Sequence, residues 1–370
     1  MFLLGWGVVF PLTLVTLKPQ TRPVAHGKFP RTMKTFGEVV SAIIKLLWIA
    51  LLCALVLVSR AGEPGPLKLV KTVPLPGVRG RIDHLAIDSK GKRLFVAALG
   101  NNTVEVLDLN AGTWLRSIAG CNKPQGLVYL PRPNLLFVAN GGDGRVRIYD
   151  CASFKPIVTV GALEDADNLR YDAKLDRVYV GYGDGGIGVI NPVTGVLTVR
   201  IPLKGHPESF QIQQDGNYLF ANVPNAQQIA VIDRQLRTVV ETWPLKDFRA
   251  NFPMALDEGN HRVFVGCRDP ARLVVLDARD GKRVADLPLS GDTYDLFYDV
   301  ARRRIYAACG EGFIDVIEQR DVDDYKLLEK ISTAPGARTC FYSLDLNQLY
   351  LALPRLVERP AAIRVYQAQP

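Results

Sequence analysis

Four short polar segments of the chain combine carboxylates with two of its four histidines. They read "RIDH" from Arg81, "DADN" from Asp165, "GHPES" from Gly205 and "GDTYD" from Gly291. Carboxylate and amide oxygens together with one or two imidazoles can bind a hard divalent cation or a small polar ligand. Such chemistry requires the segments to meet in space, so it depends on the elements that position them.

An internal repeat sets the spacing of these segments. An apolar stretch, a turn rich in glycine or asparagine and a second apolar stretch recur seven times, as in "LFVANGGDGRVRIYD". The copies start at Leu94, Leu136, Val178, Leu219, Val263, Ile305 and Leu349, which gives a period of 41 to 44 residues. Each period contains four short apolar segments separated by turn-forming residues. Four strands in a period of this length predict one blade of a β-propeller.

The two ends of the chain are predicted to share the seventh blade. The last repeat stops at Pro370 after its third strand, whereas residues 67–76, "LKLVKTVPLP", match the outer strands of the other repeats. An N-terminal strand that completes the C-terminal blade would close the ring and protect its strand edges. The sequence therefore predicts an all-β, seven-bladed β-propeller with four-stranded blades over residues 62–370.

The repeats resemble the YVTN-type β-propeller repeat family, the YncE-like proteins, over residues 67–370. The resemblance is carried by "LFVANGGDGRVRIYD", "LFVAALGNNTVEVLDLNAGT" and "VYVGYGDGGIGVINPVTG", while "VIEQRDVDDYK" and "LPRLVERPAAI" depart from the pattern. It implies a seven-bladed propeller that is exported and often has no assigned activity. The matching positions are packing and turn residues, so the resemblance carries the fold and not a chemistry.

The polar segments precede the first strands, where the blades of a propeller enter its central channel. Aligned on the period, one column reads Asp83, Gln125, Asp167, Glu208, Phe252, Tyr294 and Arg338. We expect the channel mouth to bind a ligand, with the candidate residues Asp83, His84, Gln125, Asp167, Asn168, His206, Glu208, Asn251, Tyr294, Asp295 and Arg338. A divalent cation would bind through Asp83, Asp167 and Glu208.

A simpler interpretation of the same residues remains open. Strand ends are polar because they face solvent, and the acids there would hydrate or pair with Arg81, Arg170 or Arg338. Carboxylates that converge on one mouth repel each other unless a cation, an arginine or water separates them. Arg338 lies in the same column and is the expected neutralising partner.

The N-terminus has the composition of a targeting segment. Residues 33–61 combine basic residues, an apolar core over 46–58 and a small-x-small motif at 59–61, which predicts a signal peptide or, if uncleaved, a membrane anchor. Residues 1–32 are interpreted as an upstream extension from a start codon placed too early, with a two-helix anchor as the alternative. We therefore expect an exported protein, periplasmic or extracellular, that contacts membrane only through an uncleaved segment.

Charge and cysteine usage exclude several classes of function. The net charge of +8 comes mostly from the first 61 residues, so the repeat region is too nearly neutral for a nucleic-acid surface. Five cysteines follow residue 61, and this odd number argues against a complete disulfide framework; we expect buried small hydrophobic residues. The chain contains no C-x-x-C-H motif for covalent haem and no G-x-S-x-G nucleophile elbow.

Two functions fit these observations. The favoured one is an exported, non-catalytic, monomeric propeller that binds a small ligand, an envelope component or a protein partner through the channel mouth or one loop face. The alternative is a metal-assisted hydrolase of lactone type at the same mouth. We expect no cofactor for the binding protein and a divalent cation for the hydrolase.

Overall fold

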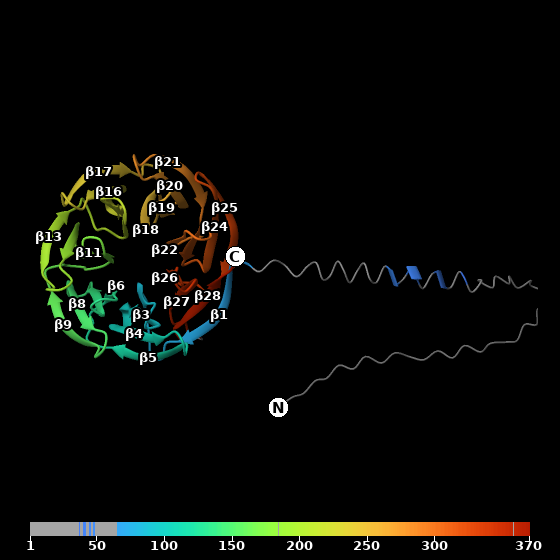
Figure 1. Ribbon diagram of the computed structural model, residues 1–370, viewed down its shortest axis with the longest axis horizontal. Helices are drawn as coiled ribbons and strands as arrows, with labels where there is room; N and C mark the ends of the chain where they lie inside the picture. The colour runs from blue at the N-terminus through green and yellow to red at the C-terminus, as the bar shows by residue number, and fades with distance from the viewer. Residues whose placement is uncertain are drawn as a thin grey trace, which may run out of the picture. The chain divides into compact units, whose positions relative to one another are not determined.

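Seven four-stranded antiparallel sheets follow one another around a central axis in the computed structural model (Figure 1). The structure describes residues 65–183, 185–357 and 359–370, together with isolated helical positions between 37 and 48. Apart from those positions, the predictions for residues 1–32 and 33–61 lie outside the described residues. Among the residues described, no helix has the length and apolar character needed to cross a membrane.

The first four blades follow the predicted order of strands, from the channel outward. Blade 1 contains β2 (Leu85–Asp88), β3 (Arg93–Ala98), β4 (Thr103–Asp108) and β5 (Thr113–Ile118). Blade 2 contains β6 (Pro124–Leu130), β7 (Leu135–Asn140), β8 (Arg145–Asp150) and β9 (Lys155–Val160). Blade 3 contains β10 (Leu169–Asp172), β11 (Arg177–Tyr182), β12 (Gly186–Ile190) and β13 (Leu197–Pro202). Blade 4 contains β14 (Phe210–Ile212), β15 (Tyr218–Val223), β16 (Gln228–Asp233) and β17 (Thr238–Pro244).

The remaining blades complete the ring. Blade 5 contains β18 (Arg249–Asp257), β19 (Arg262–Asp269), β20 (Ala271–Asp277) and β21 (Arg283–Pro288). Blade 6 contains β22 (Thr293–Asp299), β23 (Arg304–Cys309), β24 (Phe313–Asp321) and β25 (Asp324–Ser332). Blade 7 contains β26 (Cys340–Ser343), β27 (Gln348–Leu353), β28 (Ala362–Ala368) and β1 (Leu67–Pro74). Short 3₁₀ turns, η1 (Leu99–Asn101) and η2 (Pro224–Ala226), interrupt blades 1 and 4.

The second strand of each blade is apolar on both faces because it packs between two neighbouring blades. In β3, Leu94 and Val96 contact a cluster that includes Tyr350 of blade 7, whereas Phe95 packs with Leu136 of blade 2. Successive side chains of a strand point to opposite faces, so a strand buried on both sides reads as a continuous apolar run. This packing explains why the repeat is visible in the sequence.

The N-terminal strand completes the last blade, which confirms the predicted ring closure. β1 runs antiparallel to β28, with Leu67 opposite Ala368 and Pro74 opposite Ala362. Val73 and Leu75 then pack into the core between blades 7 and 1. Figure 1 shows β1 beside β28 at the edge of the last blade.

Buried aspartates close several first strands at the end away from the predicted mouth. Asp88 accepts hydrogen bonds from Arg93, and Asp172 pairs with Arg234. Asp299 accepts hydrogen bonds from Tyr306 and Tyr342. These carboxylates join neighbouring strands and blades, and we assign them a structural role.

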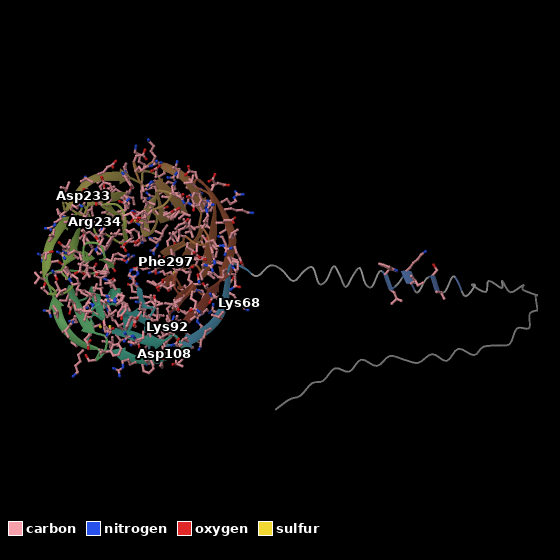
Figure 2. The ribbon with its side chains drawn as sticks, in the orientation of Figure 1. Lys68, Lys92, Asp108, Asp233, Arg234 and Phe297 are labelled. Atoms are coloured by element: carbon pink, nitrogen blue, oxygen red, sulfur yellow. The ribbon has the colours of Figure 1, made fainter. Side chains whose placement is uncertain are left out.

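The five cysteines after residue 61 behave as small hydrophobic residues, as predicted. Cys121, Cys151, Cys267, Cys309 and Cys340 are buried and unpaired. Figure 2 shows the difference between the inside and the rim of the ring: Phe297 lies near the centre, and Asp108 and Asp233 lie toward the outside.

Candidate functional site

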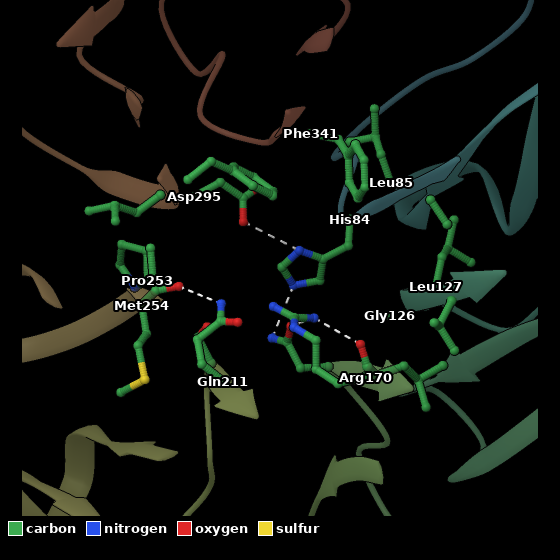
Figure 3. Close-up of a pocket in the computed structure, with 18 of the residues that line it drawn as sticks. His84, Leu85, Gly126, Leu127, Arg170, Gln211, Pro253, Met254, Asp295 and Phe341 are labelled. Atoms are coloured by element: carbon green, nitrogen blue, oxygen red, sulfur yellow. Dashed lines mark hydrogen bonds and ion pairs between the residues drawn. The ribbon is translucent and has the colours of Figure 1, made fainter. Parts of the chain in front are cut away.

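A cavity of about 360 Å³ occupies the central channel and is lined by residues of all seven blades. Six of them come from one column of the repeat, which lies immediately before the first strands of blades 1, 3 and 4 and inside those of blades 2, 5 and 6: His84, Gly126, Asn168, Ser209, Pro253 and Asp295. Residues as far apart in the sequence as His84 and Phe341 therefore surround one space. Figure 3 shows His84 and Asp295, which both line this cavity, side by side and joined by an ion pair.

A shared backbone arrangement places the polar residues in blades 1, 3 and 4. The amide of Asp83 donates to the carbonyl of Ala97 (2.7 Å), and the amide of Ala97 donates to the carbonyl of His84 (3.0 Å). Asp167 and Asn168 pair with Gly181 in the same way, and Glu208 and Ser209 pair with Asn222. The repeat alignment succeeds for these residues because the first strands of blades 1, 3 and 4 enter their sheets in the same register.

Five of the predicted residues form a group of charges next to the cavity, which we call the mouth cluster: Asp83, His84, Asp167, His206 and Glu208. His84 Nε2 lies 3.7 Å from Asp83 Oδ1 and 3.9 Å from Asp167 Oδ1. His206 Nε2 lies 3.6 Å from Asp167 Oδ2, and His206 Nδ1 donates to the carbonyl of Gly183 at 2.8 Å. Asp167 thus lies between two imidazoles.

The surroundings of the mouth cluster shift three pKa values towards or across neutral pH. Burial alone would lower the pKa of His84, but Asp295, Asp83 and Asp167 raise it to about 9. Burial would also lower the pKa of His206, but the interaction of its imidazole with Asp167 raises this pKa to about 9. Burial and the charge of Asp167 raise the pKa of Glu208 to about 7. Clusters of perturbed titratable groups are typical of functional sites, although structural ion pairs also produce them.

The buried carboxylates of the mouth cluster accept few hydrogen bonds. Neither oxygen of Asp83 accepts one from the described residues, and the same holds for Asp167 Oδ1. Arg81 compensates Asp83 by charge, since its Nη2 lies 2.8 Å from Asp83 Oδ2 without hydrogen-bond geometry. Buried polar atoms normally have a partner, so these oxygens are exceptions that call for an explanation.

Three arginines surround Tyr294 on the other side of the mouth. The guanidinium carbons of Arg81, Arg268 and Arg338 lie 5.1, 5.4 and 4.9 Å from the centre of the Tyr294 ring. Arg338 donates to both carboxylate oxygens of Asp292 at 2.7 Å. The expectation that Arg338 neutralises the acids of its own column is therefore wrong, because the loop before β22 supplies a nearer carboxylate.

The other predicted residues occupy more varied positions. Tyr294 stacks on His84 with 5.6 Å between ring centres, and Asn168 Nδ2 contacts His84 Nε2 at 3.1 Å. Gln125 Nε2 donates to Asp165 Oδ1 at 3.0 Å. Asn251 is buried between blades 4 and 5, where it donates to Asn222 Oδ1, and it does not line the cavity.

The predicted cation ligands Asp83, Asp167 and Glu208 belong to the mouth cluster. Within residues 65–370 as far as they are described, no three histidine, cysteine, aspartate or glutamate side chains are arranged to hold a metal ion together. Cation binding at this position remains a prediction.

Arg170 and Gln211 line the cavity with polar groups and were not among the predicted ligands. Three positions after the aspartate column, the repeat reads Ala86, Val128, Arg170, Gln211, Ala255, Phe297 and Phe341, and all seven line the cavity. Arg170 and Gln211 are the polar exceptions in an otherwise apolar column. This contrast is visible in the aligned repeats and is the signal that could have identified them.

Comparison with known proteins defines the class of fold. The structure is similar to a chain of hydrazine synthase from Kuenenia stuttgartiensis, with a TM-score of 0.68 and 17% sequence identity over 78% of this chain and 98% of the other. It is also similar to a chain of the mitotic checkpoint complex, with a TM-score of 0.71 and 13% identity over 84% and 94% of the two chains. The protein is a seven-bladed β-propeller. No protein-family model matches the chain, and no curated protein is similar to it in sequence.

Proposed function

We propose that this chain is an exported β-propeller of the YVTN type that binds a small ligand in its central cavity, at the end bordered by the mouth cluster. One observation carries the proposal: residues from separate blades line a single cavity of about 360 Å³, and His84 belongs to both this lining and the mouth cluster. Cavities of roughly 300–1,000 Å³ with a few converging polar groups are typical of small-molecule sites.

The chemistry of the site supports a small ligand. His84 and Asp295 present charged groups to the cavity, and Gln211 and Asn168 present amides. Leu85, Leu127 and Met254 contribute to its lining beside them. A ligand can therefore satisfy hydrogen bonds at one part of the cavity and bury apolar surface at another.

A cavity-filling substitution tests the proposal. Gln211 points into the cavity (Figure 3), so Gln211→Trp should occupy much of the space. Gln235→Trp adds the same ring to an exposed turn of blade 4 and is the matched control. We expect thermal-shift screening of small metabolites to find ligands that raise the Tm of the wild type and the control but not of Gln211→Trp. Hits that stabilise all three proteins equally, or the absence of hits, would contradict a cavity-binding function.

The export part of the proposal has a separate test. If residues 33–61 form a cleaved signal peptide, the mature chain begins near residue 62. N-terminal sequencing of the protein from the native cell envelope should find that start. A mature chain that begins at or before residue 33 would favour an anchored form.

Metal-assisted lactone hydrolysis is the alternative function of the same mouth. It predicts that calcium, magnesium, manganese or zinc raises the Tm of the wild type and supports hydrolysis of simple lactones. Replacing both Asp83 and Asp167 by Asn should abolish both effects. An unchanged wild-type Tm in all four titrations would remove this alternative.

A further inference from the structure

Arg170 places a guanidinium inside the central cavity. The residue belongs to β10, which begins two residues after Asp167, and its side chain points toward Gln211 and His84 (Figure 3). Nη1 donates to Asn168 Oδ1 at 3.1 Å and to the carbonyl of Leu169 at 2.8 Å. Nε and Nη2 have no acceptor among the residues that the structure describes.

This cation has no carboxylate partner of its own. The charges of Asp295 and Asp167 raise the pKa of Arg170 from a distance. No described carboxylate lies within 4.0 Å of its guanidinium. Burial lowers its pKa, but a guanidinium stays protonated in proteins. Arg170 therefore differs from Arg81, Arg268 and Arg338, each of which has an aspartate within 3.3 Å. The Arg170 side chain is half-buried, and a charge that is partly removed from water without a charged partner costs free energy that an anionic ligand would recover.

The carboxylate nearest to the cavity is already engaged. Asp295 Oδ2 accepts a hydrogen bond from the amide of Cys340 at 2.8 Å, and Oδ1 lies 3.5 Å from His84 Nδ1. A cationic ligand would have to compete with His84 for this carboxylate and would meet the charge of Arg170. The polar part of the cavity consequently favours an anion.

Aromatic side chains lie across the cavity from Arg170. Phe297 and Phe341 stand at the same level of the repeat as Arg170, in blades 6 and 7, and their ring centres are 5.4 Å apart. Blades 6 and 7 lie across a seven-bladed ring from blades 3 and 4, which supply Arg170 and Gln211 (Figure 1). The cavity thus offers hydrogen-bond donors on one wall and an apolar surface on the other.

We propose that the cavity binds a small organic acid, whose carboxylate accepts hydrogen bonds from Nε and Nη2 of Arg170 while its apolar body packs against Phe297 and Phe341. This inference rests on the proposed small-ligand function and specifies the chemical class of the ligand. Guanidinium groups suit it because their geometry matches two carboxylate oxygens at once.

Three probes with one aromatic ring separate charge from shape. Benzoate, benzyl alcohol and benzylamine carry a negative, a neutral and a positive group on similar bodies, and isothermal titration calorimetry measures each affinity. We expect benzoate to bind roughly 10- to 100-fold more tightly than benzyl alcohol, the usual effect of a charged hydrogen bond, and benzylamine not to bind. Benzylamine or benzyl alcohol binding as tightly as benzoate would overturn the inference.

Two substitutions assign the effect to Arg170. Arg170→Gln should lose the preference for benzoate over benzyl alcohol, and Arg170→Lys should keep part of it because charge remains without the forked geometry. Arg200→Gln, on the exposed outer strand of the same blade, is the control and should bind like the wild type. Unchanged benzoate binding by Arg170→Gln would overturn the inference.

The outcomes also separate this inference from the function on which it rests. If neutral or cationic compounds bind and Gln211→Trp abolishes their binding, the cavity is a ligand site but not an acid site. If benzoate fails to bind and no other small molecule binds either, both proposals fail.

Discussion

His84 at the start of blade 1 lies 3.5 Å, Nδ1 to Oδ1, from Asp295 of blade 6, and both residues line the central cavity. Blade 7 stands between these two blades in the ring, so the pair bridges the closure of the propeller at its axis. The same imidazole faces Asp83 and Asp167 through Nε2. One imidazole therefore lies within 4 Å of carboxylates from three blades.

The protonation of His84 should make stability depend on pH. Its pKa rises from 6.5 to about 9 on folding, so the stabilisation is complete below about pH 6.5 and is lost as the pH rises through about 9. His84→Gln should lower the free energy of unfolding by about 3 kcal/mol more at pH 6 than at pH 10. Urea unfolding at both pH values measures the difference.

His261 provides the control for this prediction. It is exposed on the turn between β18 and β19, so His261→Gln should change stability little. A loss for His84→Gln that is the same at pH 6 and pH 10 would mean that its charge does not stabilise the ring.

Replacing Glu208 should stabilise the protein at high pH, in contrast to the loss of stability expected when His84 is replaced. Its pKa rises from 4.5 to about 7 on folding, mainly by burial, so the ionised form costs stability as the pH rises from about 4.5 through 7. Glu208→Gln should therefore be nearly neutral at pH 4.5 and more stable than the wild type by about 3 kcal/mol at pH 8. The exposed Glu241→Gln in β17 is the control, and a destabilised Glu208→Gln at pH 8 would contradict this account.

The repeat made the fold and the position of the mouth predictable, because both depend on strand register. Each second strand is buried on both faces and so produces the same apolar run, and an unmatched first segment had to complete the last blade. The pairing of Asp83, Asp167 and Glu208 with Ala97, Gly181 and Asn222 is part of that register. Alignment of the sequence against itself was sufficient to bring these acids together.

The interaction partners of individual side chains were less predictable in blades whose loops or first strands differ in length from those of the other blades. Asp292 lies in the loop before β22 and pairs with Arg338, so Arg338 does not pair with the acids of the mouth cluster. β18 begins at Arg249, earlier in its repeat than β2 or β10, so Asn251 falls inside a sheet and is buried between blades. Arg170 is the second residue of β10, and its lack of a carboxylate partner depends on distances that a repeat alignment does not contain.

The free cysteines should be unreactive in the folded protein. Burial raises the pKa values of Cys151, Cys267 and Cys309 to about 12, and the thiolate is the reactive form. A chain that starts at Gly65 should give almost no reaction with Ellman's reagent in native buffer. The same chain, unfolded in guanidinium chloride, should react with the reagent at all five thiols. Rapid labelling of native protein would show that these cysteines are accessible or in transiently opened strands.

Removal of β1 should destabilise the whole ring and not only its end. β1 pairs with β28 along seven aligned residue pairs, and its end places Val73 and Leu75 against the core shared by blades 7 and 1. A chain that starts at Gly77 would expose the edge of β28 and the apolar residues beneath, and exposed strand edges promote association with other chains. We expect this truncated chain to aggregate or to lose cooperative unfolding, as measured by light scattering and thermal melts. The control starts at Gly65, keeps β1 complete and should melt like the full propeller. If the chain lacking β1 remains monomeric and melts within a few degrees of the control, the paired chain ends do not hold the ring closed.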